Sequence, residues 1–209
     1  NRDKIIKYMN NCKEMGINIL PPDINESQKD FSISGENIRF GLAAVKNVGE
    51  AAIESVIAMR RQEKFSSFMD FLGRVDLRKV NKRVIESLIK CGSFDSMGYK
   101  RRQLMECCEA AMEEAQRKQK QQNSNQASFF DDLDDSGAAS ENGLGSYNIP
   151  DLPEWERKEL LSIEKDTLGF YISGHPLYGF ADKLKFVTNT DSVSLSSKRD
   201  KDTISIAGV

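Results

Sequence analysis

Two helix-turn-helix units, about 30 residues apart, most constrain how this chain can fold. In the first, residues 41–59 (GLAAVKNVGEAAIESVIAM), apolar residues at helical spacing flank a turn that contains Asn47 and Gly49. Both residue types can adopt left-handed backbone conformations. The second unit places a helix at 65–75, a turn at 76–80 and a helix at 81–91. The repeat predicts an internal duplication and a mainly α fold.

Helical patterns also flank these units, at residues 3–15, 101–122 and 154–172. Gly16 and Gly92 end their helices as C-terminal caps, and Ser66 or Ser67 is the candidate N-cap of the second unit. Short extended pieces are expected around Phe31, Ile33 and residues 37–40, and a terminal strand from about Thr203. Residues 121–150 are rich in Gln, Asn, Ser, Gly and Asp, which predicts a flexible linker.

The net charge of −2 hides an uneven distribution. Residues 1–122 carry 22 Lys and Arg against 17 Asp and Glu, whereas residues 123–209 carry 8 against 15. The excess is greatest over residues 38–102, with 14 basic against 7 acidic side chains. This is the balance expected where a protein meets phosphate groups, although a basic face exposed only to solvent is the alternative.

The turn at 46–49 can bind a phosphate with its backbone. A tight hairpin beside a helix N-terminus presents unpaired N–H groups, and a glycine permits close approach. This is the layout of a helix-hairpin-helix motif in which Asn47 replaces the first glycine, while Lys46, Val48 and Gly49 complete the turn. Such binding to duplex DNA is independent of sequence and sensitive to salt. The alternative is an ordinary helical hairpin in which Ala51 and Ala52 allow close packing.

In the second unit the hairpin glycines are missing and four basic residues cluster instead: Arg78, Lys79, Lys82 and Arg83. Side-chain charge can replace backbone N–H groups there. The alternative is a purely structural partner for the first unit, and we expect both roles together.

A third signal is the pair Phe129 and Phe130 within the polar linker, preceded by Gln126. Adjacent aromatic rings in a segment that cannot fold alone favour a pocket on a partner. The pattern resembles the short motif by which bacterial polymerases dock on the sliding clamp, with Gln126 at the pocket rim and both rings buried. Alternatively, the rings fold back on the helix at 101–122.

Other chemistries are disfavoured by composition. The four cysteines form no CxxC pair, His175 is the only histidine, and no orienting carboxylate is evident beside it. We interpret the acidic run at 131–135 as solvated charge rather than a metal site, and His175 as a turn residue. The cysteines favour a reduced, cytoplasmic compartment. No run reaches the ~18 apolar residues of a membrane span, so we expect no membrane partner.

Several sequence segments together resemble the alpha subunits of bacterial DNA polymerase III, the C-family replicative polymerases. They are GINILPPDINES (16–27), IRFGLAAVKNVGEAA (38–52), VNKRVIESLIKCGSFD (80–95), QASFF (126–130) and EKDTLGFYISGHPL (164–177). The resemblance implies the end of a fingers domain at 1–37 and a tandem helix-hairpin-helix DNA-binding domain at 38–122. A flexible linker with the clamp-binding motif (123–150), a connecting helical segment (151–185) and the start of an OB fold (186–209) would follow.

The resemblance also implies a function. The region would bind double-stranded DNA and tether the polymerase to the sliding clamp among other replisome subunits, which raises processivity. The palm aspartates that hold two Mg²⁺ ions for nucleotidyl transfer lie upstream in the family, so neither a catalytic residue nor a cofactor is expected here. Because the chain starts at Asn1 and ends within a β-rich phrase, we expect an internal fragment. A stand-alone helix-hairpin-helix DNA-repair protein and a purely structural scaffold are the alternatives.

Overall fold

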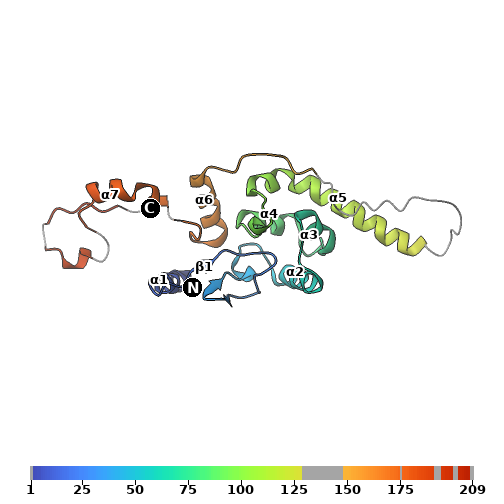
Figure 1. Cartoon of the computed structure of the whole chain (residues 1–209), viewed down its shortest axis with the longest axis horizontal. Coiled ribbons are helices and arrows are strands. Elements are labelled where there is room, and N and C mark those ends of the chain that lie inside the picture. The colour runs from blue at the N-terminus through green and yellow to red at the C-terminus, as the bar shows by residue number, and fades with distance from the viewer. Residues whose placement is uncertain (1, 129–147, 175, 191–193, 200–201, 208–209) are drawn as a thin grey trace.

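The computed structural model describes residues 2–128, 148–174, 176–190, 194–199 and 202–207. The chain is mainly helical, as the sequence predicts (Figure 1). The helices are α1 (Arg2–Glu14), α2 (Glu50–Gln62), α3 (Phe68–Arg74), α4 (Lys82–Lys90), α5 (Arg101–Ser128), α6 (Arg157–Leu168) and α7 (Ala181–Val187). Shorter 3-10 turns are η1 (Leu42–Ala44), η2 (Asp95–Met97), η3 (Pro176–Phe180) and η4 (Ser194–Ser197). Within these residues, no helix combines the length and apolarity that a membrane crossing needs.

A small sheet joins α1 to the helical units. Its order is β1 (Ile19–Leu20), β3 (Asn37–Arg39), β2 (Ser32–Ser34), with β1 parallel and β2 antiparallel to β3. Gly35, in the turn between β2 and β3, has a φ of 61°, a left-handed conformation that glycine adopts without strain. The extended pieces predicted around Ile33 and residues 37–40 are therefore confirmed.

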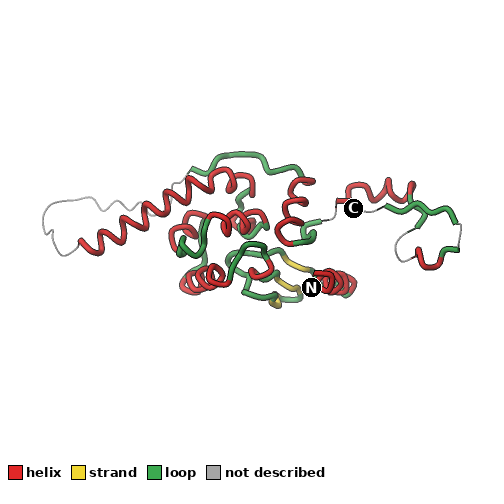
Figure 2. The backbone as a smooth tube through the Cα atoms, turned by 180° about the vertical axis from the view of Figure 1, so that it is seen from behind, coloured by secondary structure: helices red, strands yellow, loops and turns green. Residues whose placement is uncertain are grey.

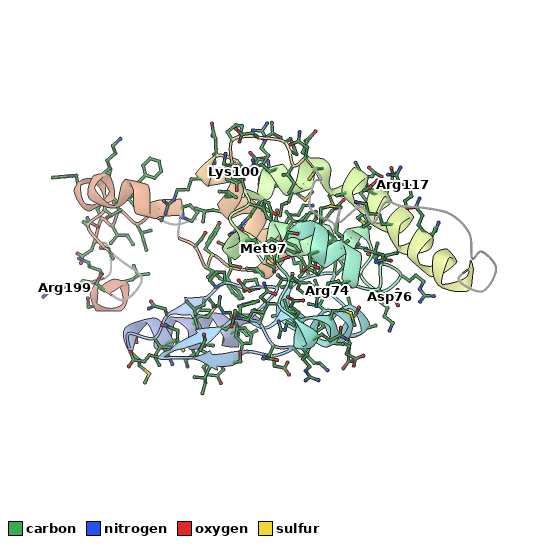
Figure 3. All side chains as sticks on the ribbon, turned by 45° about the vertical axis from the view of Figure 1, so that its right-hand side comes forward. Arg74, Asp76, Met97, Lys100, Arg117 and Arg199 are labelled. Atoms are coloured by element: carbon green, nitrogen blue, oxygen red, sulfur yellow. The ribbon has the colours of Figure 1, made fainter. Side chains whose placement is uncertain are left out.

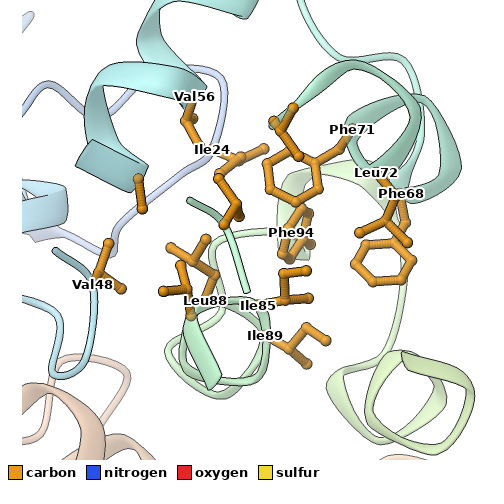
Figure 4. Packing of buried hydrophobic residues seen from close by; sticks show 14 of the residues in the cluster. Ile24, Val48, Val56, Phe68, Phe71, Leu72, Ile85, Leu88, Ile89 and Phe94 are labelled. Atoms are coloured by element: carbon orange, nitrogen blue, oxygen red, sulfur yellow. The ribbon is translucent and has the colours of Figure 1, made fainter. Parts of the chain in front are cut away.

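The core lies where α2, α3 and α4 meet (Figure 4). Phe94, which follows α4, packs edge-to-face against Phe68 and Phe71 of α3, with each ring centroid 5.1 Å away. Buried positions in α2 and α4 share one register, each pair 32 residues apart: Ala52 and Val84, Ile53 and Ile85, Val56 and Leu88. The shared register agrees with the predicted duplication.

The first unit departs from its prediction on one side of the turn. A helix was expected before Asn47, but only the three-residue 3-10 turn η1 forms there. The backbone is already constrained, because the N–H groups of Leu42 and Ala43 donate to Gln28 and Lys29 in the preceding loop. The N–H of Lys46, which in an α-helix would donate to the carbonyl of Leu42, donates instead to Thr167, so the i to i−4 ladder does not form.

The long helix α5 packs against α4 and α3 as far as Gln119, and its C-terminal end extends beyond them (Figures 1 and 2). Its predicted buried stripe of Leu104, Cys108, Ala111 and Ala115 is confirmed. The helix continues to Ser128, six residues beyond the predicted end at 122. Of these six residues (NSNQAS), only Gln126 and Ala127 are good helix formers. The others extend a helix that has already formed, which costs less than starting a new one.

The chain then returns to the core through α6. Glu154 accepts hydrogen bonds from the N–H groups of Arg101 (2.7 Å) and Arg102 (3.1 Å), and so caps the start of α5. Glu164 of α6 is fully buried and accepts from the N–H groups of Ile172 and Ser173, at 3.0 and 3.1 Å. These bonds hold α6 and the turn after it as one unit.

The C-terminal part, which includes α7, lies beyond α6 and away from the core (Figure 1). The strand predicted from Thr203 is wrong for residues 202–207, which form no strand. In the described chain, one bond between backbone groups joins them to a segment distant in sequence: the N–H of Asn189 donates to the carbonyl oxygen of Ser205 at 3.1 Å. An alternating sequence forms a strand only beside a neighbour that pairs with its backbone, and one such bond does not make a ladder.

Candidate nucleic-acid interface

Hairpin 1, residues 45–49, leads directly into α2. Asn47 has a φ of 66° and is the one non-glycine residue with a positive φ in the part of the chain that the structure describes. Asparagine tolerates this region better than most residues. Gly49, by contrast, is extended, with φ −82° and ψ 162°. Of the two turn residues expected to permit a left-handed conformation, only Asn47 uses it.

The N-terminus of α2 is open. Gly49 is its N-cap residue and supplies no side-chain hydrogen bond. The N–H groups of a helix's first turn have no intrahelical acceptor, and they carry the positive end of the helix dipole. A Cβ built at Gly49 meets no atom within 4 Å. The space beside the Gly49 Cα is therefore open, apart from its chain neighbours, in the described chain.

Three contacts fix the position of hairpin 1. Val45 and Val48 are buried, and the N–H of Val48 donates to the carbonyl of Val45 at 3.3 Å. The Asn47 amide nitrogen donates to the Ser87 hydroxyl of α4 at 3.1 Å. The N–H of Lys46 donates to the carbonyl of Thr167 in α6 at 3.1 Å, while the Lys46 side chain stays exposed. The turn is thus anchored to α4 and α6 at once.

An acidic side chain stands beside this turn. Glu50, the first residue of α2, pairs with Lys29, whose hydrogen bond holds the pKa of the Glu50 carboxyl below its usual value. Both side chains are exposed. The pair offsets a negative charge that would otherwise repel an anion at the helix terminus.

Hairpin 2, residues 77–81, has the same place in the second unit but a different chemistry. Its N-cap residue, Asn81, accepts a hydrogen bond from the N–H of Val84 at 3.2 Å and so closes the N-terminus of α4. The N–H groups of Lys79 and Val80 donate to the carbonyl of Asp76, at 2.9 and 2.8 Å. Its backbone donors are therefore largely used within the protein.

The four predicted basic residues of the second unit are exposed. Arg78, with 93% of its side chain accessible, pairs with Asp76 at 3.1 Å. Lys82 pairs with Glu109 of α5 at 2.9 Å. These hydrogen bonds raise the pKa of Arg78 and of Lys82, so both remain cationic at neutral pH. Lys79 and Arg83 add charge to the same surface.

A cleft beside hairpin 2 was not foreseen from the sequence. It has a volume of about 950 Å³ and lies between α2, the end of α3, hairpin 2 and α5. Arg74 and Asp76 mark its position near α5 (Figure 3). Gln119 and Lys120 of α5 line one side. No sequence signal distinguishes these two residues from the other Gln and Lys residues around them.

The predicted clamp-binding residues and His175 lie wholly or partly outside the described residues. Gln126 lies within α5, and its side chain is outside the described residues, as are Phe129, Phe130 and His175. Among the described residues, no group of three His, Cys, Asp or Glu side chains is placed to hold a metal ion. Cys91 is fully buried, and burial raises the pKa of its thiol to about 12.

Comparison with known proteins matches residues 16–104 to the helix-hairpin-helix motif family. The whole chain is 39% identical over 213 aligned residues to the DNA polymerase III subunit alpha of Saccharopolyspora erythraea, and covers 18% of that protein. Over the full length of this chain, it is 36% identical to the subunit alpha of Neisseria meningitidis, and it covers 17% of that protein. Residues making up 90% of the chain align at 39% identity with the subunit alpha of Mycobacterium tuberculosis, covering 16% of it. The chain is therefore homologous to one segment of the DNA polymerase III alpha subunits, and this segment carries a helix-hairpin-helix motif.

Proposed function

We propose that this chain is the region of a replicative DNA polymerase that holds the DNA duplex by its phosphate backbone. One observation carries the proposal: two helical hairpins in the same register are packed on one core, and both present cationic or N–H groups to solvent. The Asn47 to Ser87 hydrogen bond joins them directly. Two phosphate-binding turns at a fixed separation suit a polymer of regularly spaced phosphates.

At hairpin 1 the ligand is a single phosphate group at the N-terminus of α2. The first-turn N–H groups donate to its oxygens, and the helix dipole favours its negative charge. Gly49 leaves room for this approach because it carries no side chain. The exposed Lys46 side chain adds a cation at the rim.

At hairpin 2 the side chains of Arg78, Lys79, Lys82 and Arg83 contact further phosphates. Arg78 and Lys82 would exchange their partners Asp76 and Glu109 for phosphate oxygens on binding. Ion pairs between exposed side chains contribute little to stability, so this exchange is inexpensive. None of these groups reads base edges, so the binding is independent of sequence.

The test is the binding of the 209-residue chain to fluorescent duplexes of two unrelated sequences over a range of salt concentrations. We expect equal affinities for both sequences and a linear fall of log K with log salt, because counterions are released from the DNA. A flat salt response, or binding of one sequence only, contradicts the proposal.

We also propose that residues 126–130 tether the polymerase to its sliding clamp, with Phe129 and Phe130 as buried anchors and Gln126 at the rim. The sequence motif supports this proposal. The direction of α5 supports it as well, because the C-terminal end of this helix leads away from the core (Figure 2). Such a tether makes rebinding intramolecular. Binding to the clamp of the same organism should be lost when both phenylalanines are changed to alanine. Equal binding by both proteins would contradict the tether.

We further infer that nucleotide transfer, with its two Mg²⁺ ions, belongs to parts of the polymerase outside these 209 residues. The chain alone then binds primed duplex without extending it when Mg²⁺ and nucleotides are added. Incision of a damaged duplex by the purified chain would instead favour the alternative, a DNA-repair protein of the same motif family.

A further inference from the structure

The cleft beside hairpin 2 has walls that the fold holds in place. The Gln119 amide nitrogen lies within hydrogen-bond distance of three carbonyl oxygens at the end of α3: Leu72 (3.1 Å), Gly73 (2.9 Å) and Val75 (3.2 Å). On the opposite side, the hydroxyl of Ser55 in α2 accepts from the N–H of Asp76 at 3.2 Å. Helices α2 and α5 are therefore both attached to the segment that becomes hairpin 2.

The charges that line the cleft are mostly basic. Arg74 is paired with Asp70 at 3.1 Å and Arg78 with Asp76. The lining also includes the exposed side chains of Lys79 and Lys120, so its four cations stand against two carboxylates, those of Glu54 and Asp76. An anion in the cleft would meet cations from two different elements, hairpin 2 and α5.

We propose that this cleft is a third contact for the DNA backbone, in which Lys120 of α5 binds a phosphate together with Lys79. The proposal rests on the duplex-binding function proposed above and extends the interface from the hairpins to α5. Charge complementarity identifies the partner: the cleft is continuous with the basic surface of hairpin 2, through Arg78 and Lys79.

The position of Lys120 suits a separate phosphate. Lys82 of α4 pairs with Glu109 of α5, which lies 11 residues before Lys120. A helix rises ~1.5 Å per residue, so Lys120 lies about 16 Å along α5 from the position where Lys82 contacts it. Successive phosphates of one strand advance by ~3.4 Å along the duplex axis, so this separation spans several phosphates. The cleft therefore lengthens the footprint on DNA.

The chain offers a matched control for Lys120. Lys118 pairs with Glu114, does not line the cleft, and lies two residues away in α5. Two residues correspond to ~200° around a helix, so the two side chains leave opposite sides of it. Lys118→Gln and Lys120→Gln change the net charge equally. Both residues lie near the surface, so neither change should alter the melting temperature by more than a degree or two.

The experiment measures duplex affinity and its salt dependence for Lys118→Gln, Lys120→Gln and Glu54→Gln. We expect Lys120→Gln to weaken binding several-fold and to reduce the slope of log K against log salt by about 0.9, the loss of one phosphate contact. Glu54→Gln should strengthen binding because it removes one of the two carboxylates that line the cleft. Lys118→Gln should change neither quantity beyond experimental error.

Equal effects of Lys118→Gln and Lys120→Gln would overturn the proposal, since the overall charge of α5 would then suffice. Unchanged binding for Lys120→Gln would overturn it as well. If the unaltered chain binds no duplex at all, the proposed function itself fails, and that outcome is distinct from a failure of the cleft alone.

Discussion

Hairpins 1 and 2 occupy the same place in two copies of one unit, yet they treat the N–H groups at the start of the following helix in opposite ways. Hairpin 1 leaves the N-terminus of α2 without a side-chain cap and opens it to solvent through Gly49. Hairpin 2 closes the N-terminus of α4 with Asn81 and surrounds it with basic side chains. One copy is suited to binding through its backbone and the other through its side chains.

The comparison of the two units indicates which positions the duplication constrains. Both copies keep the buried residues at the same register, because these pack on the shared core. The turn residues differ, since a phosphate can be met either by N–H groups or by cations. Changes that remove the shared core, one hairpin or only one cap should therefore have effects of decreasing size.

The largest effect should come from Phe94→Ala, which removes a buried ring from the core cluster that contains residues of both units. Phe94 is 1% exposed and packs against Phe68 and Phe71. Truncation of a buried phenylalanine costs about 3–5 kcal/mol. Thermal unfolding should show a large fall in melting temperature, and duplex binding should weaken at both hairpins. An unchanged melting temperature would mean that the two units do not share this core.

Replacing the four basic residues of hairpin 2 and the first turn of α4 by glutamine tests the side-chain half of the comparison. The change removes Arg78, Lys79, Lys82 and Arg83 without touching the Asn81 cap. The slope of log K against log salt should fall by about 3 to 4, at about 0.9 for each lost phosphate contact, with an affinity loss above tenfold at low salt. A variant with glutamine at Arg157, Lys158, Lys165 and Lys183, exposed residues of α6 and α7, is the matched control for charge. Similar losses in both variants would mean that total charge matters and hairpin 2 does not.

Asn47→Val tests the backbone of hairpin 1. Asn47 has a φ of 66°, and a β-branched residue is strained there by roughly 1–2 kcal/mol. The change also removes the hydrogen bond to Ser87. Chemical denaturation should report a loss of about 2 kcal/mol in the free energy of unfolding. Asn47→Gly should relieve the backbone strain but not restore the hydrogen bond. If valine is tolerated without loss, the left-handed turn is not required.

The smallest effect, and the sharpest comparison, comes from exchanging the two N-caps. Gly49→Asn introduces a cap at α2, where a side chain meets no steric obstacle, and should stabilise the protein by a few tenths of a kcal/mol. It should nevertheless weaken duplex binding, because the new side chain occupies N–H groups that the phosphate needs. Asn81→Gly should cost a similar few tenths and leave the affinity unchanged. Opposite signs of stability and affinity for Gly49→Asn are the diagnostic result, and a gain in both would contradict backbone binding at hairpin 1.

Much of the fold could be predicted because it depends on local pattern. The apolar spacing located α2, α4 and the buried stripe of α5, and Gly16 and Gly92 have the positive φ expected of helix C-caps. The candidate cations of hairpin 2 were predicted as a cluster and are exposed together. The helix before Asn47 and the strand from Thr203 were wrong, since each depends on backbone partners distant in sequence.

The helical periodicity, the duplicated units and the residues available to meet phosphates follow from side-chain spacing and charge, so they are predictable from the residues alone. The packed fold sets three further contacts: Asn47 bonds to Ser87, the N–H of Lys46 donates to Thr167, and Gln119 holds α5 against the end of α3. Those contacts join residues 40 to 121 positions apart in the chain. Burial and hydrogen bonding between such distant residues depend on how the helices pack, which no local pattern encodes.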